Sequence, residues 1–222
     1  MGFQGGASAM EMIKVTEVVR GKRKIIFESG WTVWLDRRLM PDFPLDPGTE
    51  VDRPAFEKYI LLHQYPSALN DAVALLAVRN RSRLEIRQSL SRRKYDEAVI
   101  DMVLFKLEKE KLLNDGEFTV QWVQSRISKY GPIRIAQELQ MKGIDRGKSG
   151  SVMEEILTED QELENAVLLA LKKLRTEKAE TGQMKCFQHV TSFLVRRGYS
   201  WEKARKAYEM ALERNREENT EQ

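Results

Sequence analysis

The chain has 222 residues, of which 41% are hydrophobic and 32% are charged, and its net charge is only +3 at neutral pH. This composition supports a buried core, and the near-neutral balance excludes a uniformly basic nucleic-acid-binding protein. The single cysteine, Cys186, excludes an internal disulfide and a cysteine-based zinc site. No apolar run reaches the roughly 18 to 20 residues that cross a bilayer, and no secretion signal opens the chain, so we expect a cytoplasmic protein without a membrane partner.

The N-terminal part of the chain predicts a tail followed by a small sheet. The first nine residues, MGFQGGASA, are typical of an expression remnant, and we expect residues 1–12 to form a tail outside the fold. Three β-branched and aromatic runs follow at 13–19, 24–28 and 31–35, separated by glycine-containing turn signals. They predict an antiparallel β-meander, which must pack against neighbouring helices because so small a sheet is only marginally stable alone.

Residues 37–66 are predicted to connect this sheet to the helical part, so that sheet and connector together occupy 13–66. Prolines at 41, 44 and 47 interrupt any long element, and one helix is expected over 53–64. We expect Pro66 to end that helix and Ser67 to cap the next one, because proline removes a backbone donor from a helix interior.

The remainder predicts a mainly α protein built from three tandem modules of three helices each. Module one covers 67–114, module two covers 115–157, and module three covers 158–222 with an acidic tail. In module two, Asn114 or Asp115 is expected to cap the first helix, Pro132 to open the second, and Gly143 to end it. Residues 146–150 are predicted to be a flexible basic loop before a helix at 150–157. Trp122 and Trp201 lie on apolar stripes and are predicted to be core residues.

An internal repeat supports the three-module interpretation. The pairs Ile86-Leu90, Ile135-Leu139 and Val190-Leu194 are each followed, at the same offset, by Lys94-Tyr95, Gly143-Ile144 and Gly198-Tyr199. A module of this size cannot bury its own core alone, so we expect neighbouring modules to stack in an elongated, curved array.

An ordered series of motifs resembles the RecX family, which regulates the bacterial recombinase RecA. The resemblance covers residues 67–212 and is carried by Arg79-x-Arg81-Ser82 before Glu85-Ile86-x-x-x-Leu90, Leu112-Leu113-Asn114-Asp115-x-x-Phe118, Trp122-Val123, Leu139-x-x-Lys142-Gly143-Ile144 and Arg196-Arg197-Gly198-Tyr199-Ser200. Lys94 stands where the family often has glycine, and Thr119 where alanine is common. The resemblance implies a protein that lies in the groove of a RecA–DNA filament, inhibits strand exchange and ATP turnover, and modulates recombination, DNA repair and the SOS response.

Basic residues on and beside the repeated helices are the candidates for contact with RecA or DNA. Between Arg79 and Lys94 there are seven basic residues and one acid, Glu85. In stacked modules, cations at corresponding places would line one surface and attract acidic protein or phosphates. The ten candidates are Arg83, Arg87, Arg92, Arg93, Arg126, Arg134, Lys142, Arg146, Arg196 and Arg197.

No pattern indicates catalysis, a cofactor or a metal site. Gly147-Lys148-Ser149 lacks the glycine that a phosphate-binding P-loop needs five places earlier, where Lys142 stands. His63 and His189 fall in different predicted units. Cys186 follows Lys185, which could slightly lower the pKa of the thiol, but a bystander thiol is the favoured interpretation.

We therefore expect a non-enzymatic monomer that binds a RecA filament and single- or double-stranded DNA without sequence specificity. Two alternatives stay open: a helix-turn-helix DNA-binding regulator and a helical adaptor with no DNA role. The regulator needs base-reading side chains, and Gln137 and Gln140 are the only polar amides on the relevant helix.

Overall fold

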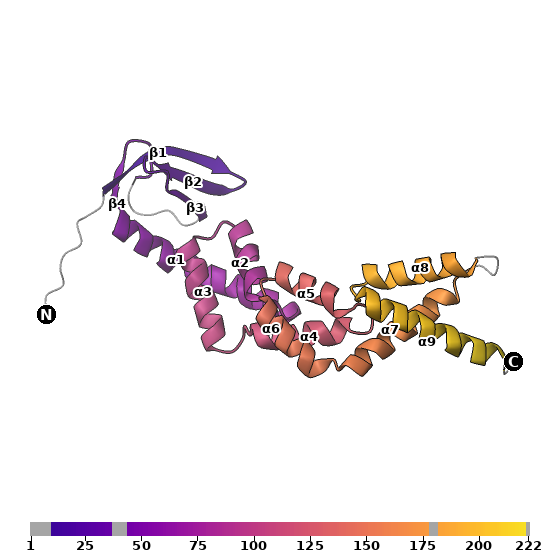
Figure 1. Ribbon diagram of the computed structural model, residues 1–222. Helices are drawn as coiled ribbons and strands as arrows, with labels where there is room; N and C mark the ends of the chain where they lie inside the picture. The colour runs from indigo at the N-terminus through magenta and orange to yellow at the C-terminus, as the bar shows by residue number, and fades with distance from the viewer. Residues whose placement is uncertain (1–9, 37–43, 178–181, 221–222) are drawn as a thin grey trace. The chain divides into compact units, whose positions relative to one another are not determined.

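The structure is a computed structural model that describes residues 10–36, 44–177 and 182–220. The chain divides into two compact units, unit 1 and unit 2, at the boundary between Leu113 and Asn114 (Figure 1). The protein is mainly α-helical, with three-helix modules and a small antiparallel sheet at its N-terminal end, as predicted. The predicted tail at residues 1–9 lies outside the described residues.

The sheet has four antiparallel strands in the order β3-β2-β1-β4. The strands are β1 (Met10–Val19), β2 (Lys22–Phe27), β3 (Thr32–Asp36) and β4 (Glu50–Asp52). The prediction of a tail to residue 12 is wrong, because Met10–Met12 pair with β4. Neither segment has a strong strand pattern, and the pairing joins parts of the chain that are distant in sequence.

Unit 1 continues with α1 (Arg53–Val78), α2 (Arg83–Arg92) and α3 (Glu97–Lys109). The predicted break at Pro66 is wrong, since α1 passes through this proline as one helix. A proline inside a helix costs about 3 kcal/mol. Burial of α1 on both sides of Pro66, at Phe56 and Ile60 before it and Ala68 and Ala72 after it, outweighs that cost.

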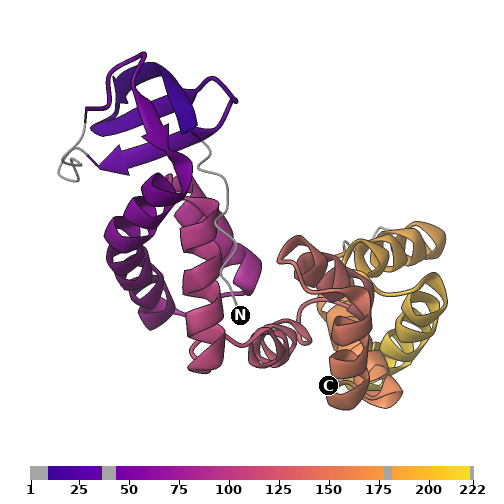
Figure 2. The same cartoon turned by 90° about the vertical axis from the view of Figure 1, so that its left-hand side faces the viewer.

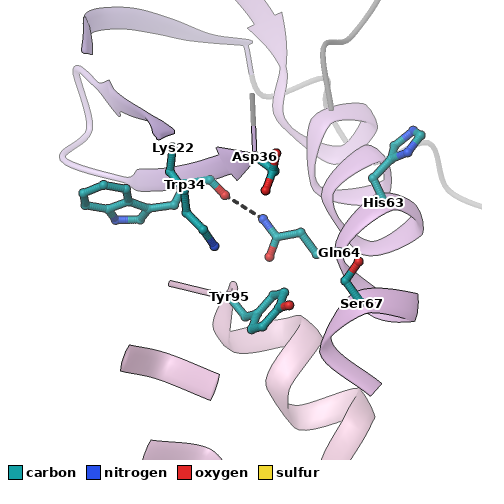
Figure 3. A pocket seen from close by; sticks show the side chains of 7 residues that line it. All are labelled: Lys22, Trp34, Asp36, His63, Gln64, Ser67 and Tyr95. Carbon is teal, nitrogen blue, oxygen red and sulfur yellow. Dashed lines mark hydrogen bonds between the residues drawn. The ribbon is translucent and has the colours of Figure 1, made fainter. Parts of the chain in front are cut away.

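The sheet and the helices of unit 1 share one hydrophobic core. Figure 2 shows the sheet against the N-terminal end of α1. Ile25, Phe27, Val33 and Leu35 are buried on the sheet face that joins this core. A polar contact also crosses the junction, because Nε2 of Gln64 on α1 donates a hydrogen bond of 2.7 Å to the carbonyl of Trp34 (Figure 3).

Unit 2 contains the helices of modules two and three. Module two has α4 (Asp115–Arg126), α5 (Pro132–Met141) and α6 (Arg146–Ile156), and module three has α7 (Glu159–Leu174), α8 (Gln183–Arg196) and α9 (Trp201–Thr220). Asn114 caps α4 and Pro132 opens α5, as predicted.

Two predictions about unit 2 are wrong. Residues 146–150 are helical rather than a flexible loop, because Oδ1 of Asp145 caps α6 by accepting a hydrogen bond of 2.9 Å from the backbone N–H of Lys148. Trp201 is 57% exposed rather than buried in the core, because its position at the very start of α9 leaves little of the helix to cover it.

The same backbone turn follows α2, α5 and α8. The N–H groups of Tyr95, Ile144 and Tyr199 donate to the carbonyls of Leu90, Leu139 and Leu194 over 3.3, 3.0 and 3.2 Å. The residue before each donor is left-handed, with φ of 65° at Lys94, 83° at Gly143 and 94° at Gly198. The predicted repeat is therefore confirmed at the backbone, and Lys94 adopts the conformation that glycine adopts in the other two turns.

Candidate cationic binding surface

The arginines of module one are largely engaged within unit 1. Nε of Arg83 lies 2.7 Å from Oε1 of Glu108, and Nη1 of Arg87 lies 2.6 Å from Oε2 of Glu97. Arg87 also contacts Asp101. These acids belong to α3, so the cationic excess that the sequence shows between 79 and 94 is offset by carboxylates from a neighbouring helix.

Asp71 of α1 is a second centre of pairing in unit 1. It forms an ion pair with Arg93 and accepts a hydrogen bond of 2.8 Å from the hydroxyl of Tyr95. Burial alone would raise the pKa of the Asp71 carboxyl, but the hydrogen bonds from Arg93 and Tyr95 outweigh it and leave the pKa below its usual value. The contacts fix the turn after α2 against α1.

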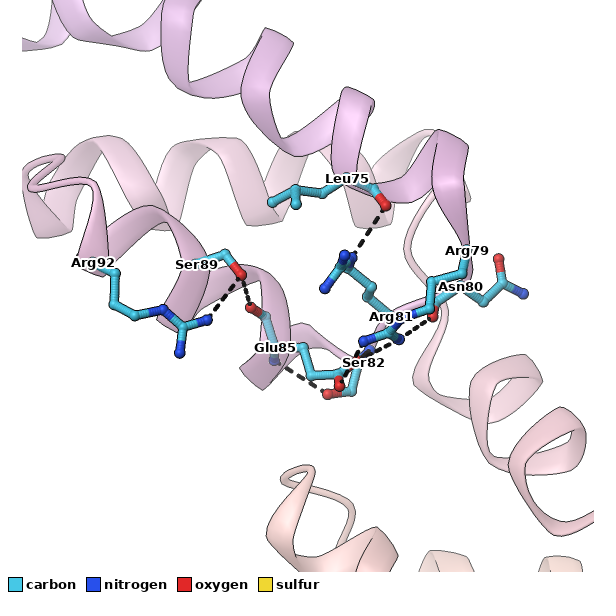
Figure 4. A network of polar contacts seen from close by, with 8 residues as sticks. All are labelled: Leu75, Arg79, Asn80, Arg81, Ser82, Glu85, Ser89 and Arg92. Atoms are coloured by element: carbon cyan, nitrogen blue, oxygen red, sulfur yellow. Dashed lines mark hydrogen bonds and ion pairs between the residues drawn. The ribbon is translucent and has the colours of Figure 1, made fainter. Parts of the chain in front are cut away.

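The segment that joins α1 to α2 uses further arginines structurally (Figure 4). Both terminal nitrogens of Arg79 lie 3.1 Å from the Glu85 carboxylate, and Nε of Arg81 donates to the carbonyl of Leu75 over 3.1 Å. Ser82 caps α2 and forms a reciprocal pair with Glu85. Of the module-one candidates, Arg92 has the fewest polar contacts: it is exposed, and within the described part of the chain its side chain reaches only the hydroxyl of Ser89, over 3.4 Å.

Unit 2 gathers four of the candidate cations around aromatic rings. We define the cation–aromatic cluster as Arg126, Arg134, Lys142 and Arg197 with the rings of Trp122 and Tyr130. The guanidinium carbons of Arg134 and Arg197 lie 4.2 and 5.3 Å from the centre of the Tyr130 ring. The guanidinium carbon of Arg126 and Nζ of Lys142 lie 4.5 and 4.3 Å from the centre of the Trp122 ring. Contacts of this length are attractive and hold the side chains in place.

The cluster forms where modules two and three meet. The N–H of Gly131 donates to the carbonyl of Arg197 over 2.9 Å, and the N–H of Ile133 donates to the carbonyl of Gly198 over 3.1 Å. Nη1 of Arg197 also donates to the carbonyl of Lys129 over 3.0 Å. The backbone of one module is thus bonded directly to the backbone of the next, which sets the positions of the cationic side chains.

A single carboxylate, Glu138, is shared by two members of the cluster. Its oxygens lie 3.4 Å from Nε of Arg126 and 3.3 Å from Nε of Arg134, and its side chain is only 17% exposed. Two arginines of the cluster therefore share one largely buried acid. The indole N–H of Trp122 is buried and has no hydrogen-bond partner among the described residues.

The other two candidates lie outside the cluster. Arg146 begins α6 and Arg196 ends α8, and both are exposed. The cluster depends on Tyr130, which was not among the candidates predicted from the sequence. Its signal was local: an aromatic residue directly before Gly131-Pro132, with basic residues four before and four after it.

Cys186 and His189 have ordinary structural surroundings. Burial raises the pKa of the Cys186 thiol and nearby Glu177 adds to the effect, so the slight lowering considered from Lys185 is wrong. Nδ1 of His189 lies 2.9 Å from Oε2 of Glu177. Over residues 10–36, 44–177 and 182–220, acids, histidines and the cysteine form no group of three that could hold a metal ion. In the same ranges, every helix is too short or too polar to span a membrane.

Modules one and two match known protein-family models. Two family models match, described as the first and second three-helix domains of RecX, over residues 68–107 and 114–147. Regulatory protein RecX of Mycobacterium ulcerans (strain Agy99) is 37% identical over 146 residues, which are 64% of this chain and 84% of that protein. The chain belongs to the RecX family.

Other RecX proteins extend the likeness to the rest of the chain. Regulatory protein RecX of Listeria welshimeri is 29% identical over 197 residues, which are 88% of this chain and 72% of that protein. A crystal structure of regulatory protein RecX has a TM-score of 0.62 and 23% identity, covering 91% of this chain and 99% of its own. RecX from Lactobacillus salivarius has a TM-score of 0.60 and 22% identity, over 66% of this chain and 96% of its own. The RecX fold therefore includes most of this chain.

Proposed function

We propose that this RecX protein binds RecA–DNA filaments in their helical groove and inhibits the strand exchange and ATPase activities of the recombinase. Acting in the cytoplasm, it would modulate recombination, DNA repair and the SOS response. A ligand shifts an assembly equilibrium only by its different affinities for the two states, so binding must favour a filament state that exchanges strands or turns over ATP poorly.

The observation that carries the proposal is the cation–aromatic cluster of unit 2. Guanidinium groups bind carboxylates and phosphates through paired hydrogen bonds, and both groups occur on a protein–DNA filament. The cluster is ordered before any partner arrives, because rings and the Gly131 junction hold its side chains. Ordering in advance lowers the entropy lost on binding.

The module-one arginines are weaker candidates on the same physical grounds. Arg83, Arg87 and Arg93 would have to leave carboxylates of their own unit before contacting a partner. The contact with the partner then replaces an existing ion pair, so the net gain in binding free energy is small. We rank Arg134, Lys142 and Arg197 above them as partner contacts because aromatic rings hold these side chains in place, although Arg134 also shares the Glu138 carboxylate with Arg126.

The test is inhibition of the RecA ATPase on single-stranded DNA by the double variant Arg134→Gln/Lys142→Gln. Glutamine removes each charge without placing a new anion beside Glu138. We expect half-inhibition to require about tenfold more variant than wild type, which corresponds to about 1.4 kcal/mol. The matched control, Arg205→Gln/Lys206→Gln, removes the same charge from exposed positions on α9 and should inhibit like wild type. Full inhibition by a folded Arg134→Gln/Lys142→Gln variant would refute the role of the cluster.

DNA binding without RecA separates the main proposal from a helix-turn-helix regulator. Gln137 and Gln140 are both exposed on α5, so they remain available as base readers. We expect instead equal affinity for unrelated duplexes and a steep loss of affinity with added salt. Strong preference for one duplex sequence would favour the regulator.

A further inference from the structure

The outer face of the N-terminal sheet carries an aromatic and cationic surface. Along β3, Val33 and Leu35 are buried in the core, so Trp34 and Asp36 point to the opposite face. Across the pairing with β2, Trp34 stands opposite Lys24, and Asp36 opposite Lys22. An indole therefore lies within a row of lysines on the side of the sheet that the core does not cover.

The turn after α2 adds cations to this face. Nζ of Lys94 lies 5.3 Å from the centre of the Trp34 ring, and Nζ of Lys24 lies 5.8 Å from it. Nζ of Lys22 donates a hydrogen bond of 2.5 Å to the carbonyl of Arg93 and lies 5.1 Å from the Tyr95 ring. These contacts tie the sheet to module one within unit 1.

The hydrogen bonds of Gln64 make this junction rigid. Nε2 of Gln64 donates to the carbonyl of Trp34 (Figure 3). Its Oε1 accepts a hydrogen bond of 2.9 Å from the N–H of Asp96. Gln64 is buried, so breaking either bond would leave an unpaired polar group. The relation of Trp34 to the turn after α2 is thus fixed by the fold.

A cleft of about 560 Å³ lies between the sheet and the turn, a size typical of ligand sites. Its cationic lining residues are Arg20, Lys22, Arg92, Arg93 and Lys94. The acids are Asp36 and Asp71, of which Asp71 is already engaged by Arg93 and Tyr95. Burial lowers the pKa of Lys22, although Asp36 and Asp71 oppose the effect. A bound anion would stabilise the charged form of that lysine.

We propose that this cleft binds a segment of single-stranded nucleic acid, with one base on the Trp34 indole and neighbouring phosphates on Lys22, Lys94 and Arg20. Aromatic side chains set among cations are the usual means of holding single strands, because every base has a stacking face. A duplex keeps its bases stacked inside, so it cannot use the indole. An acidic peptide could use the cations but would leave the indole without a matching group. The site belongs to unit 1 and needs neither RecA nor the cation–aromatic cluster.

The experiment measures the fluorescence anisotropy of a short labelled oligothymidylate titrated with the full chain. We expect Trp34→Ala to weaken binding about tenfold through loss of base stacking, and Trp34→Phe to restore most of it. Lys94→Ala should reduce the slope of log affinity against log salt by about 0.7, the contribution of one phosphate contact. The matched control is Trp201→Ala, which removes an exposed tryptophan of unit 2 and should bind like wild type.

Two further probes make the proposal refutable. An abasic oligonucleotide keeps the phosphates but lacks bases, so wild type should bind it about tenfold more weakly than oligothymidylate, whereas Trp34→Ala should not distinguish the two. Equal binding of both by wild type, or competition by polyglutamate as effective as by oligothymidylate, would overturn the proposal. Trp34→Ala should still inhibit the RecA ATPase when the DNA is saturated with RecA. A negative result in the oligonucleotide titration would therefore refute the single-strand site without refuting the proposed inhibition of RecA.

Discussion

The junction between modules two and three is closed by two glycines, and we predict that Gly131→Ala destabilises unit 2 by about 2 to 3 kcal/mol. A Cβ at residue 131 would lie 2.5 Å from the carbonyl oxygen of Gly198 and 2.7 Å from the backbone nitrogen of Tyr199. Ordinary contact begins at 3.4 Å, so the two turns must move apart by the difference, 0.9 Å. Overpacking of this kind costs about 1–3 kcal/mol.

The movement also affects hydrogen bonding across the junction. It lengthens the bonds from Gly131 and Ile133, each worth about 0.5–1.5 kcal/mol. Gly131 has a φ of −81°, which alanine adopts freely, so the loss of stability in Gly131→Ala comes from the steric contact and not from backbone strain. Gly198→Ala should cost about 1–2 kcal/mol more, because its φ of 94° is unfavourable for alanine.

The assay is hydrogen exchange of α5 and α8 amides combined with urea unfolding. In Gly131→Ala, the amides at position 131 and of Ile133, which donate across the junction, should exchange faster than in wild type. The control, Gly150→Ala, changes a helical glycine with nothing within 4 Å of the new Cβ, and should stabilise unit 2 by about 0.5–1 kcal/mol. A Gly131→Ala protein within about 0.5 kcal/mol of wild type would show that the junction is not closely packed.

Three further predictions concern unit 1. Lys94→Gly should be about 1 kcal/mol more stable than Lys94→Ala in thermal unfolding, since both lose the ammonium but only glycine is unstrained at a φ of 65°; equal stabilities would contradict this. Because hydrogen bonds from Arg93 and Tyr95 outweigh burial and lower the pKa of Asp71, the stability from that carboxylate is present above the pKa of an unfolded aspartate and is lost as pH falls through the folded pKa. Asp71→Asn should therefore lose less stability than wild type between pH 7 and about pH 3, and identical losses would contradict the linkage. Pro66→Ala should stabilise α1 by about 1–3 kcal/mol in urea unfolding, and a destabilised variant would show that the proline is required.

Local features of the fold were predictable from the sequence because their causes lie within a few residues. Asn114 caps α4, Pro132 opens α5, and Gly143 takes the left-handed position after it. The same spacing after Leu90, Leu139 and Leu194 reflects the same hydrogen bond in each turn, in which the carbonyl of the leucine accepts from the backbone N–H five residues later.

Features that depend on distant partners were not predictable in the same way. Pro66 signals a helix end, and only the shared core of sheet and helices explains why α1 continues. The strand pairing of Met10–Met12 requires β4, which has a weak pattern of its own. Counting charges along α2 could not show that α3 neutralises Arg83 and Arg87.

The candidate site was predictable by residue type and only in part by position. Arg126, Arg134, Lys142 and Arg197 do gather in unit 2. The ring that organises them, Tyr130, had only a local signal, the basic residues four before and four after it, because the rest of its role comes from the approach of Arg197 in three dimensions.

The continuity of α1 has a practical consequence for work with fragments. The family match begins at residue 68, in the middle of this helix, so a truncation placed at that boundary would cut it in two. Such a fragment would discard Phe56 and Ile60, which cover one side of the shared core, and leave apolar surface open to water. Precipitation of such a fragment would therefore reflect the cut through α1 rather than an unstable module. We expect a soluble fragment to begin at the first residue of β1 or, if unit 1 is left out, at Asn114.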